Sequence, residues 1–475
     1  MSADLVAALE HPLPATLPAG TPTVVFCCGT CFHRRAPIAD LAIVVDGVHH
    51  RPTAAGMPRP DRVAVDPAAF HSGFWGTVPV PPQQAGEVEV ALAARLVDGS
   101  EEVAPLGRIA IAPREPAPPL GRPARPGLIA VCMATYDPDP ALFRAQVESL
   151  RAQTDRNWVC VISDDCSSPE RFADLTAVVG EDERFVVSRS EGRLGFYRNF
   201  ERALRLAPAE AELIALCDQD DRWRPEKLEV LRAALGGAQL VYCDQRLVDP
   251  EGRVLRDTMW QGRRNNHTSL ASLLIANSIT GAAALFRREV AEMALPFPET
   301  PSLQFHDHWI GLVALASGDV AYVDRPLYDY VQHAGAIFGE VSGGRPRRSP
   351  AGLLRGGRGA YFLGYLPRTV QARMLLVRCG GRLTRGKRRA LQRYIASARA
   401  PLAFAWLAAR PLRMLAGRTE TLASETELVH GIVWFRATTI LARFVRRPGR
   451  VPADASFPDP LSFEQKRLRR WRSGA

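Results

Sequence analysis

The sequence has little lysine, no long hydrophobic run and no second cysteine pair, and the last two shortages argue against a membrane-spanning helix and a zinc site. Of its 60 basic residues only Lys227, Lys387 and Lys466 are lysine. No apolar run reaches the ~18 residues of a membrane-spanning helix. The N-terminal residues lack a basic segment followed by an apolar core, so we expect no secretory signal. Cys28 and Cys31 form a single CxxC, which disfavours a zinc site, and we expect reduced, structural thiols.

The remaining composition is that of a globular protein with an uneven charge. Of the 475 residues, 47% are hydrophobic and 23% charged, which excludes wholesale disorder and fibrous structure. Residues 345–475 hold 28 Lys and Arg against 6 Asp and Glu, a balance of +22, whereas residues 1–344 have a balance of −12. This polarity predicts a catalytic body with a basic region that meets a polyanion, either membrane lipid or nucleic acid.

The first third of the chain predicts a small β-domain. After an N-terminal tail (1–20), residues 21–113 contain short apolar runs separated by Gly and Pro, which is typical of an immunoglobulin-like β-sandwich. A proline-rich linker, 114–126, follows. The domain could bind sugar chains or pack on its neighbour, and packing is the favoured interpretation. The aromatic residues that could serve either purpose are Phe70, Phe74 and Trp75.

Strands alternate with amphipathic helices over residues 127–345. Helices are expected to open at Asp139 and Pro225. The expected strands are 128–135, 158–163, 185–189, 212–217 and 239–243. This alternation predicts an α/β domain with a doubly wound, mostly parallel sheet. Ligands of such sheets bind beyond the carboxyl ends of the strands.

Residues 346–475 predict a basic, amphipathic helical region that associates with a membrane. The arginines expected on one helix face are Arg436, Arg443 and Arg447, and the apolar residues expected on the other are Ile432, Val433, Ile440, Leu441 and Phe444. Such a helix is typical of a membrane surface, and the tail 465–472 could bind anionic lipid. The alternative is a helix packed on the body with a solvated basic face. We expect a cytoplasmic protein, peripheral on the inner face of the cell membrane.

Carboxylates follow the fourth expected strand. Asp218, Asp220 and Asp221 lie within four residues, where they repel one another unless a cation neutralises them. Oxygen ligands suit Mg²⁺ or Mn²⁺, which commonly bridge substrate phosphates. The alternative is a polar loop that caps the helix at Pro225.

A second acidic pair, Asp164 and Asp165, ends the second expected strand, and Thr135, Tyr136 and Asp137 end the first. Both groups belong to the same edge of the expected sheet. An Asp there can accept a hydrogen bond from a nucleotide base, and hydroxyl or backbone groups can bind the ribose.

These motifs together resemble the nucleotide-sugar-binding half of family 2 glycosyltransferases, which have the GT-A fold. The resemblance covers roughly 127–340, and its DQDD-W, HD-W and Y-QH motifs are most similar to bacterial rhamnosyltransferase-type members that build cell-surface polysaccharide. The segments that carry it are LIAVCMATYDPDP, VISDDCSS, GRLGFYRNFERAL, ALCDQDDRW, SITGAAALFRREV and FHDHWIGLVALASGDVAYVDRPLYDYVQHAGAIFG.

The resemblance implies a role for each matched residue. Asp218 and Asp220 match the DxD motif that holds Mn²⁺ or Mg²⁺ on the donor diphosphate, with Asp220 the direct ligand and Asp218 nearer the ribose. His333 matches a position that can reach the metal or the diphosphate, although a lone His is often structural. The positions implied for the base and nucleotide are Thr135, Tyr136, Asp137, Asp164, Asp165, Arg198 and Asn199.

On the acceptor side the resemblance makes Asp307 the catalytic base, and a carboxylate there can take the proton of an attacking hydroxyl. The alternative is an Asp that caps the following apolar helix. Further acceptor-side positions are Thr280, Gly281, His306 and Trp309.

The expected function is therefore that of an inverting, metal-dependent glycosyltransferase. It would move a sugar, rhamnose from dTDP-rhamnose in the leading version, onto a lipid-linked or cell-surface glycan. The alternatives are a UDP-hexose or UDP-galactofuranose donor, or a nucleotide-regulated nucleic-acid-binding protein. The last is disfavoured, since no helix-turn-helix, zinc module or aromatic–basic interleaving is present.

Overall fold

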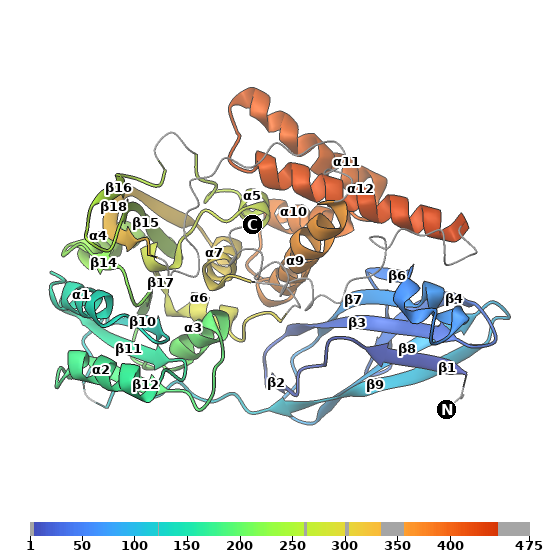
Figure 1. The fold of residues 1–475 in the computed structure, drawn as a ribbon, viewed down its shortest axis with the longest axis horizontal. Coiled ribbons are helices and arrows are strands. Elements are labelled where there is room, and N and C mark those ends of the chain that lie inside the picture. The colour runs from blue at the N-terminus through green and yellow to red at the C-terminus, as the bar shows by residue number, and fades with distance from the viewer. Residues whose placement is uncertain (1–3, 122, 261–263, 300–303, 334–355, 445–475) are drawn as a thin grey trace.

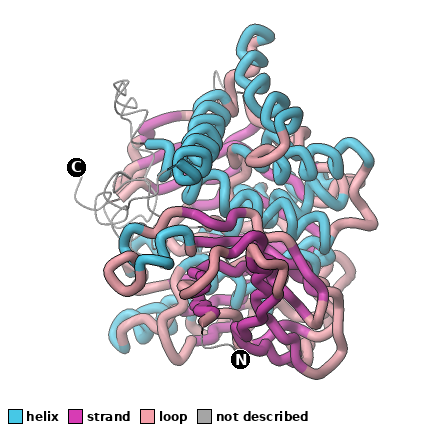
Figure 2. The backbone as a smooth tube through the Cα atoms, turned by 90° about the vertical axis from the view of Figure 1, so that its right-hand side faces the viewer, coloured by secondary structure: helices cyan, strands magenta, loops and turns pink. Residues whose placement is uncertain are grey.

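The computed structural model describes residues 4–121, 123–260, 264–299, 304–333 and 356–444, with side chains to 440 in the last helix. Three parts lie against one another: a β-sandwich, an α/β unit built on one large sheet, and a layer of C-terminal helices above both (Figure 1). Viewed from the side of the sandwich, its strands lie below the C-terminal helices (Figure 2). All nine cysteines are free thiols.

The N-terminal part consists of two sheets around a common apolar core. One sheet has the order β1-β3-β7-β6 and the other β2-β9-β8-β4-β5. Their bounds are β1 (Leu5–Leu9), β2 (Thr16–Pro18), β3 (Thr23–His33), β4 (Ile38–Val45), β5 (Val48–His50), β6 (Ala54–Met57), β7 (Gly73–Val80), β8 (Glu87–Leu96) and β9 (Glu101–Ala112). β1 and β2 fall in the expected tail, 1–20. They form strands because Leu5, Ala7 and Leu9 pack on the inter-sheet core.

Strand β3 contributes side chains to two hydrophobic cores, because successive side chains of a strand point to opposite faces. Val25 and Cys27 contact the inter-sheet core, whereas Val24, Phe26 and Cys28 join the main core of the molecule. The sandwich therefore packs on the rest of the chain through one of its sheets.

The expected sandwich aromatics are packing residues. Phe74 and Trp75 have no exposed surface and Phe70 is buried. The Trp75 ring meets the ring of Tyr361, from the C-terminal layer, edge to face at 6.1 Å. The rings of Phe74 and Trp75 are therefore not available for a sugar chain.

The α/β unit is built on a nine-stranded sheet of order β12-β11-β10-β13-β17-β15-β18-β14, with β16 beside β15. Its strands are β10 (Ile129–Thr135), β11 (Trp158–Asp164), β12 (Phe185–Arg189), β13 (Leu213–Cys217), β14 (Arg222–Trp223), β15 (Leu240–Val248), β16 (Val254–Arg256), β17 (Ala284–Arg287) and β18 (Val320–Val331). The four strands from β12 to β13 run parallel, which confirms the predicted α/β class. β17 lies antiparallel between β13 and β15, so the sheet is mixed beyond this point.

Helices flank the sheet on both faces (Figure 1). They are α1 (Pro140–Arg151), α2 (Pro169–Val179), α3 (Phe196–Arg205), α4 (Lys227–Leu235), α5 (Leu270–Ile275), α6 (Arg288–Ala294) and α7 (His306–Ser317). α1 begins as expected, because the Asp139 carboxylate accepts the backbone N–H groups of Ala141 and Leu142. α7 is apolar and buried from His308 to Ala316, in the centre of the core.

The C-terminal layer contains a π-helical turn (Ala360–Tyr365), α9 (Leu366–Arg378), α10 (Arg385–Ala396), α11 (Pro401–Ala409), a 3₁₀ segment (Arg410–Ala416) and α12 (Leu422–Phe444). Within the described ranges no helix is long and apolar enough to cross a membrane. The side chains of Leu441, Phe444 and Arg443, and the whole of Arg447 and the tail 465–472, lie outside the described residues.

The structure corrects the expected faces of the helix now seen as α12. Ile432 and Phe435 are buried in the main core, whereas Val433 and Ile440 are exposed. Arg436, expected on a solvated basic face, donates hydrogen bonds to the backbone carbonyls of Ser397 and Ala398. These carbonyls belong to the end of α10, so α12 packs on the body through a face that includes its arginine.

We predict that α12 depends on Gly431. A Cβ at this position would lie 2.7 Å from the backbone N of Tyr361 and 2.8 Å from the carbonyl C of Ala360. Backbone cannot move aside as a side chain can, so Gly431→Ala should destabilise the protein by about 1–3 kcal/mol. Gly386→Ala is the control, because its Cβ would meet nothing within 4 Å in α10 and should be neutral or stabilising. Equal thermal unfolding midpoints for the two variants would contradict this packing.

Candidate active site

The carboxyl ends of the parallel strands align at one edge of the sheet. Thr135 of β10 lies opposite Asp164 of β11, which in turn lies opposite Arg189 of β12. The Thr135 hydroxyl donates to Asp164 Oδ1 at 3.1 Å. The Asn199 amide, from α3, donates to the carbonyls of Thr135 and Ser163 at 3.1 and 2.9 Å. Asn199 therefore joins the ends of β10 and β11 from beneath the edge.

The two carboxylates expected to bind the base are buried and have protein partners. Asp164 accepts hydrogen bonds from Thr135 and from the backbone and hydroxyl of Ser167. Asp165 accepts the backbone N–H groups of Leu194 and Gly195 at 2.6 and 2.9 Å. Asp165 thus holds the loop that leads into α3, and Asp164 shapes the turn after β11.

Tyr136 and Asp137 lie on the loop that follows β10. Gln219, from the acidic loop after β13, pairs with the backbone of Tyr136 through bonds of 2.8 and 3.3 Å. Asp137 is exposed, has a φ of 38° and accepts the Ser168 N–H at 2.8 Å. The Arg193 guanidinium lies 3.6 Å from the centre of the Tyr136 ring. The stacked side chains of Arg193 and Tyr136 therefore border this edge of the sheet.

Arg198, expected near the nucleotide, lies elsewhere. It forms ion pairs with Glu201 of its own helix and with Glu299. Arg198 and Glu299 line a small pocket of about 80 Å³ together with Phe26 of the sandwich. The ion pairs with Glu201 and Glu299 hold the Arg198 guanidinium. Glu299 is distant in the sequence, so this pairing depends on the tertiary structure.

The acidic loop after β13 is electrostatically strained. Burial, followed by the proximity of Asp220 and Asp307, raises the pKa of Asp218 to about 7. Burial and the charges of Asp218 and Asp220 hold the pKa of Asp221 well above its usual range. Asp221 turns inward, accepting the Val331 N–H. A divalent cation would relieve the repulsion that raises these pKa values.

His333, after β18, extends this cluster. Its Nε2 lies 2.8 Å from Asp220 Oδ2, and this hydrogen bond raises the pKa of the imidazole. Across the described part of the chain no three His, Cys, Asp or Glu side chains lie at metal-binding distances. The donor set nonetheless fits Mn²⁺ or Mg²⁺, since it offers the oxygens of Asp218 and Asp220 with one imidazole beside them.

The expected acceptor side adjoins the acidic loop. Thr280 precedes a 3₁₀ turn, Gly281–Ala283, and a Cβ on Gly281 would lie 2.7 Å from His306 Nε2 and 3.5 Å from Asp307 Cβ. The Gly281 N–H donates to the Asp307 carboxylate. Burial raises the pKa of Asp307 to about 7. The structure therefore brings Gly281, His306 and Asp307 together.

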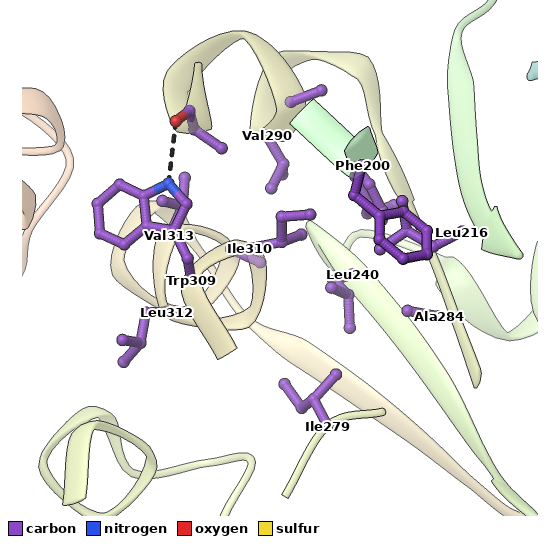
Figure 3. Close-up of a cluster of buried hydrophobic side chains, with 14 of the residues drawn as sticks. Phe200, Leu216, Leu240, Ile279, Ala284, Val290, Trp309, Ile310, Leu312 and Val313 are labelled. Carbon is purple, nitrogen blue, oxygen red and sulfur yellow. Dashed lines mark hydrogen bonds between the residues drawn. The ribbon is translucent and has the colours of Figure 1, made fainter. Parts of the chain in front are cut away.

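The residues that flank Asp307 point into the protein. Trp309 has no exposed surface, and its indole N–H donates to the Ala294 carbonyl at 2.9 Å (Figure 3). Trp309 packs in the core in place of the expected acceptor-side role, because the helix that carries it is apolar and buried from Trp309 to Ala316. His306 is buried and stacked on Phe200 at 3.7 Å, and burial lowers its pKa to about 3. Among the described residues its ring nitrogens have no hydrogen-bond partner.

Lys227, at the start of α4, is a residue that the sequence analysis did not select. It is fully buried, its ammonium lies 3.3 Å from the centre of the Trp223 ring, and it donates to the Ala282 carbonyl. Burial lowers its pKa to about 8, opposed by nearby Asp221 and Asp218. The sequence feature that could have drawn attention to Lys227 is the scarcity of lysine in this arginine-rich chain.

Part of the chain is similar to proteins that are already known. Residues 130–293 match the family model described as glycosyl transferase family 2. An uncharacterized protein, y4gI, of Sinorhizobium fredii is 33% identical over 122 residues, 25% of this chain and 13% of that protein. The succinoglycan biosynthesis protein ExoW of Rhizobium meliloti is 31% identical over 103 residues, 21% of this chain and 31% of that protein. The chain thus spans less than a third of either relative.

One solved structure that the chain matches is S. aureus TarS 1-349 in complex with UDP-GlcNAc. The match has 15% sequence identity and a TM-score of 0.42, and it covers 67% of this chain and 92% of that chain. The mannosyltransferase PcManGT from Pyrobaculum calidifontis, in complex with GDP-Man and Mn²⁺, has 17% identity and a TM-score of 0.36 over 69% and 89%.

The family match covers the strand ends, the acidic loop and the Gly281 turn. Residues 130–293 are therefore the part of the chain that is similar to glycosyl transferase family 2.

Proposed function

We propose that this chain is a glycosyltransferase that moves a sugar from a nucleotide-diphosphate donor to a glycan acceptor, with inversion at the anomeric carbon. The observation that carries the proposal is the electrostatic coupling of Asp218 to both Asp220 and Asp307. It means that the proposed donor-side and acceptor-side carboxylates lie close enough for their charges to interact. The match of residues 130–293 to glycosyl transferase family 2 supports the same conclusion.

The donor half of the site is the sheet edge. The Tyr136 and Asp137 loop would bind the nucleoside, shaped from below by Thr135, Asp164, Asp165 and Asn199. Mn²⁺ or Mg²⁺, held by Asp218 and Asp220 with His333 beside them, would neutralise the charge of the leaving diphosphate. Arg198 is left out of this assignment, because its two ion pairs engage it elsewhere.

Asp307 would act as the base on the acceptor half. It is partly exposed, and the Gly281 N–H fixes its carboxylate. A carboxylate so placed takes the acceptor hydroxyl's proton as that oxygen attacks the anomeric carbon opposite the diphosphate, which inverts the configuration. Thr280 and Gly281 would border the space in which the hydroxyl would lie, with His306 packed behind Gly281.

One relative, the succinoglycan biosynthesis protein ExoW, supports a polysaccharide as the product. Our leading donor is dTDP-rhamnose and our leading acceptor a lipid-linked glycan at the inner face of the membrane. A UDP-hexose or UDP-galactofuranose donor is the alternative within the same chemistry. The nucleic-acid-binding alternative is not favoured by the family match.

The donor site is tested by titrating the purified chain with UDP, dTDP, GDP and CDP, with and without Mn²⁺, by calorimetry and thermal shift. One nucleotide should stabilise the protein in a metal-dependent way, and Asp220→Asn should remove the metal dependence. Glu251→Gln, an exposed acid in a turn, is the control and should behave as wild type. Binding of no nucleotide under either condition would overturn the proposed function.

The role of Asp307 predicts a pH dependence. Because burial raises its pKa to about 7, the carboxyl is protonated and inactive as a base below that pH. The rate of sugar transfer should rise about tenfold per pH unit towards about pH 7 and then level off. Asp307→Asn should lower kcat by about 10²–10⁴-fold and abolish the acid limb, whereas exposed Asp324→Asn should change neither. An unchanged acid limb in Asp307→Asn would assign the limb to another group.

Lys227 is predicted to position the acceptor-side turn through Ala282. Lys227→Met keeps the volume but removes the hydrogen bond to the carbonyl and the charge near Asp218 and Asp221. It should lower kcat by about 10–100-fold, change the donor KM far less and tighten metal binding, because less positive charge opposes the cation. Lys387→Met is the matched control, since that lysine also donates to a backbone carbonyl, of Gly318 at 2.7 Å. A loss confined to KM would contradict the positioning role.

A further inference from the structure

The segment Pro401–Ala416, called here the apolar hairpin arm, exposes apolar side chains and turns its arginines toward the protein. It comprises α11 and the 3₁₀ segment that follows. Its exposed residues are all apolar: Pro401, Leu402, Ala405, Ala409, Leu412, Met414, Leu415 and Ala416. The most exposed are Leu402, at 87%, and Leu415, at 82%. Ordinary surface helices place polar residues on this face.

The polar groups of the arm point inward. Arg410 and Arg413 both contact Glu425 of α12, at 2.9 and 3.4 Å, and both donate to the hydroxyl of Ser272 on α5. Glu425 is buried. These contacts attach the arm to the body through its arginines. The apolar face of the arm is therefore directed outward by ion pairs and hydrogen bonds.

The charge around the arm identifies what covers it. Residues 356–419 contain fourteen Lys and Arg and no Asp or Glu. Exposed arginines lie on α10 before the arm and directly after it, among them Arg389, Arg393 and Arg418. Glu420 and Glu425, the acids beside the arm, are both paired with its own arginines. Exposed apolar side chains next to exposed arginines match an anionic lipid surface, whose headgroups attract the cations while the acyl region takes the leucines. A second copy of this chain is disfavoured, because two such basic surfaces repel each other.

We propose that the apolar hairpin arm docks this protein on an anionic membrane. The surface differs from the one expected from the sequence, which placed the contact on the basic face around Arg436. In the fold it occupies the outer edge of the C-terminal layer (Figure 1). Docking here does not depend on transfer chemistry, so the two proposals can fail separately.

The arm also lies close to the acceptor side. Ser272, its anchor, belongs to α5, and the carbonyl of Leu273 on the same helix accepts a hydrogen bond of 2.7 Å from His308 Nε2. His308 follows Asp307 directly. One short helix therefore separates the docking surface from the acceptor-side carboxylate, and a membrane-held acceptor would reach the site from this face.

The test is flotation of the full chain with vesicles of phosphatidylcholine alone and of phosphatidylcholine with phosphatidylglycerol. Wild type should float with the anionic vesicles, and L402S/L412S/L415S should lower the floating fraction at least about tenfold. The control variant is V65S/L255S, which removes two exposed apolar side chains from other parts of the surface and should float as wild type. Nucleotide binding and the thermal midpoint show that each variant is folded.

Three results would overturn the proposal. One is wild type that stays unbound with both kinds of vesicle, and another is a triple variant that floats as well as wild type. The third is wild type that light scattering shows to be a dimer and that the triple variant makes monomeric, since the arm would then bind a second copy. High salt should weaken but not abolish the floating fraction if leucines and arginines both contribute.

Discussion

The repulsion among carboxylates at one edge of the sheet is the constraint on which the proposed site depends. Asp218 and Asp220 share the loop after β13, whereas Asp307 comes from a distant segment of the chain, and Asp220 and Asp307 add to burial in raising the cost of ionising Asp218. Beneath them a single buried ammonium, that of Lys227, opposes this charge without forming an ion pair, since its hydrogen bond goes to the Ala282 carbonyl. The cluster is thus left with an excess of negative charge, which suits a cation and a diphosphate but is a liability for stability alone.

Local patterns predicted the donor edge, because each of its parts lies within one short segment. An apolar run followed by Thr135, by Asp164 or by Asp218 marks both the strand and the side chain at its end, and the parallel pairing brings these ends into one row. The Asp139 cap was predictable for the same reason. The antiparallel β17 was not, since its reversal depends on how the chain returns between β13 and β15.

Side chains with competing partners could not be predicted in this way. Trp309 was expected beside the acceptor, but its indole N–H finds the Ala294 carbonyl in the core. The sequence of α12 suggested an arginine face for solvent or lipid, yet Arg436 meets the free carbonyls at the end of α10. In each case the decisive partner lies on another element, and only the assembled fold presents it.

The same principle explains why the proposed membrane surface lies on the arm and not on α12. A helix that carries arginines and leucines can place either group outward, and amphipathicity alone does not say which. Here Glu425 and Ser272 supply buried partners for Arg410 and Arg413, so the arginines turn inward and the leucines are left in water. Exposed leucines held by buried ion pairs have a stability cost that a solvated helix would avoid. A lipid surface removes that cost, and because Ser272 lies on the helix that also contacts His308, it would do so on the side from which the acceptor enters.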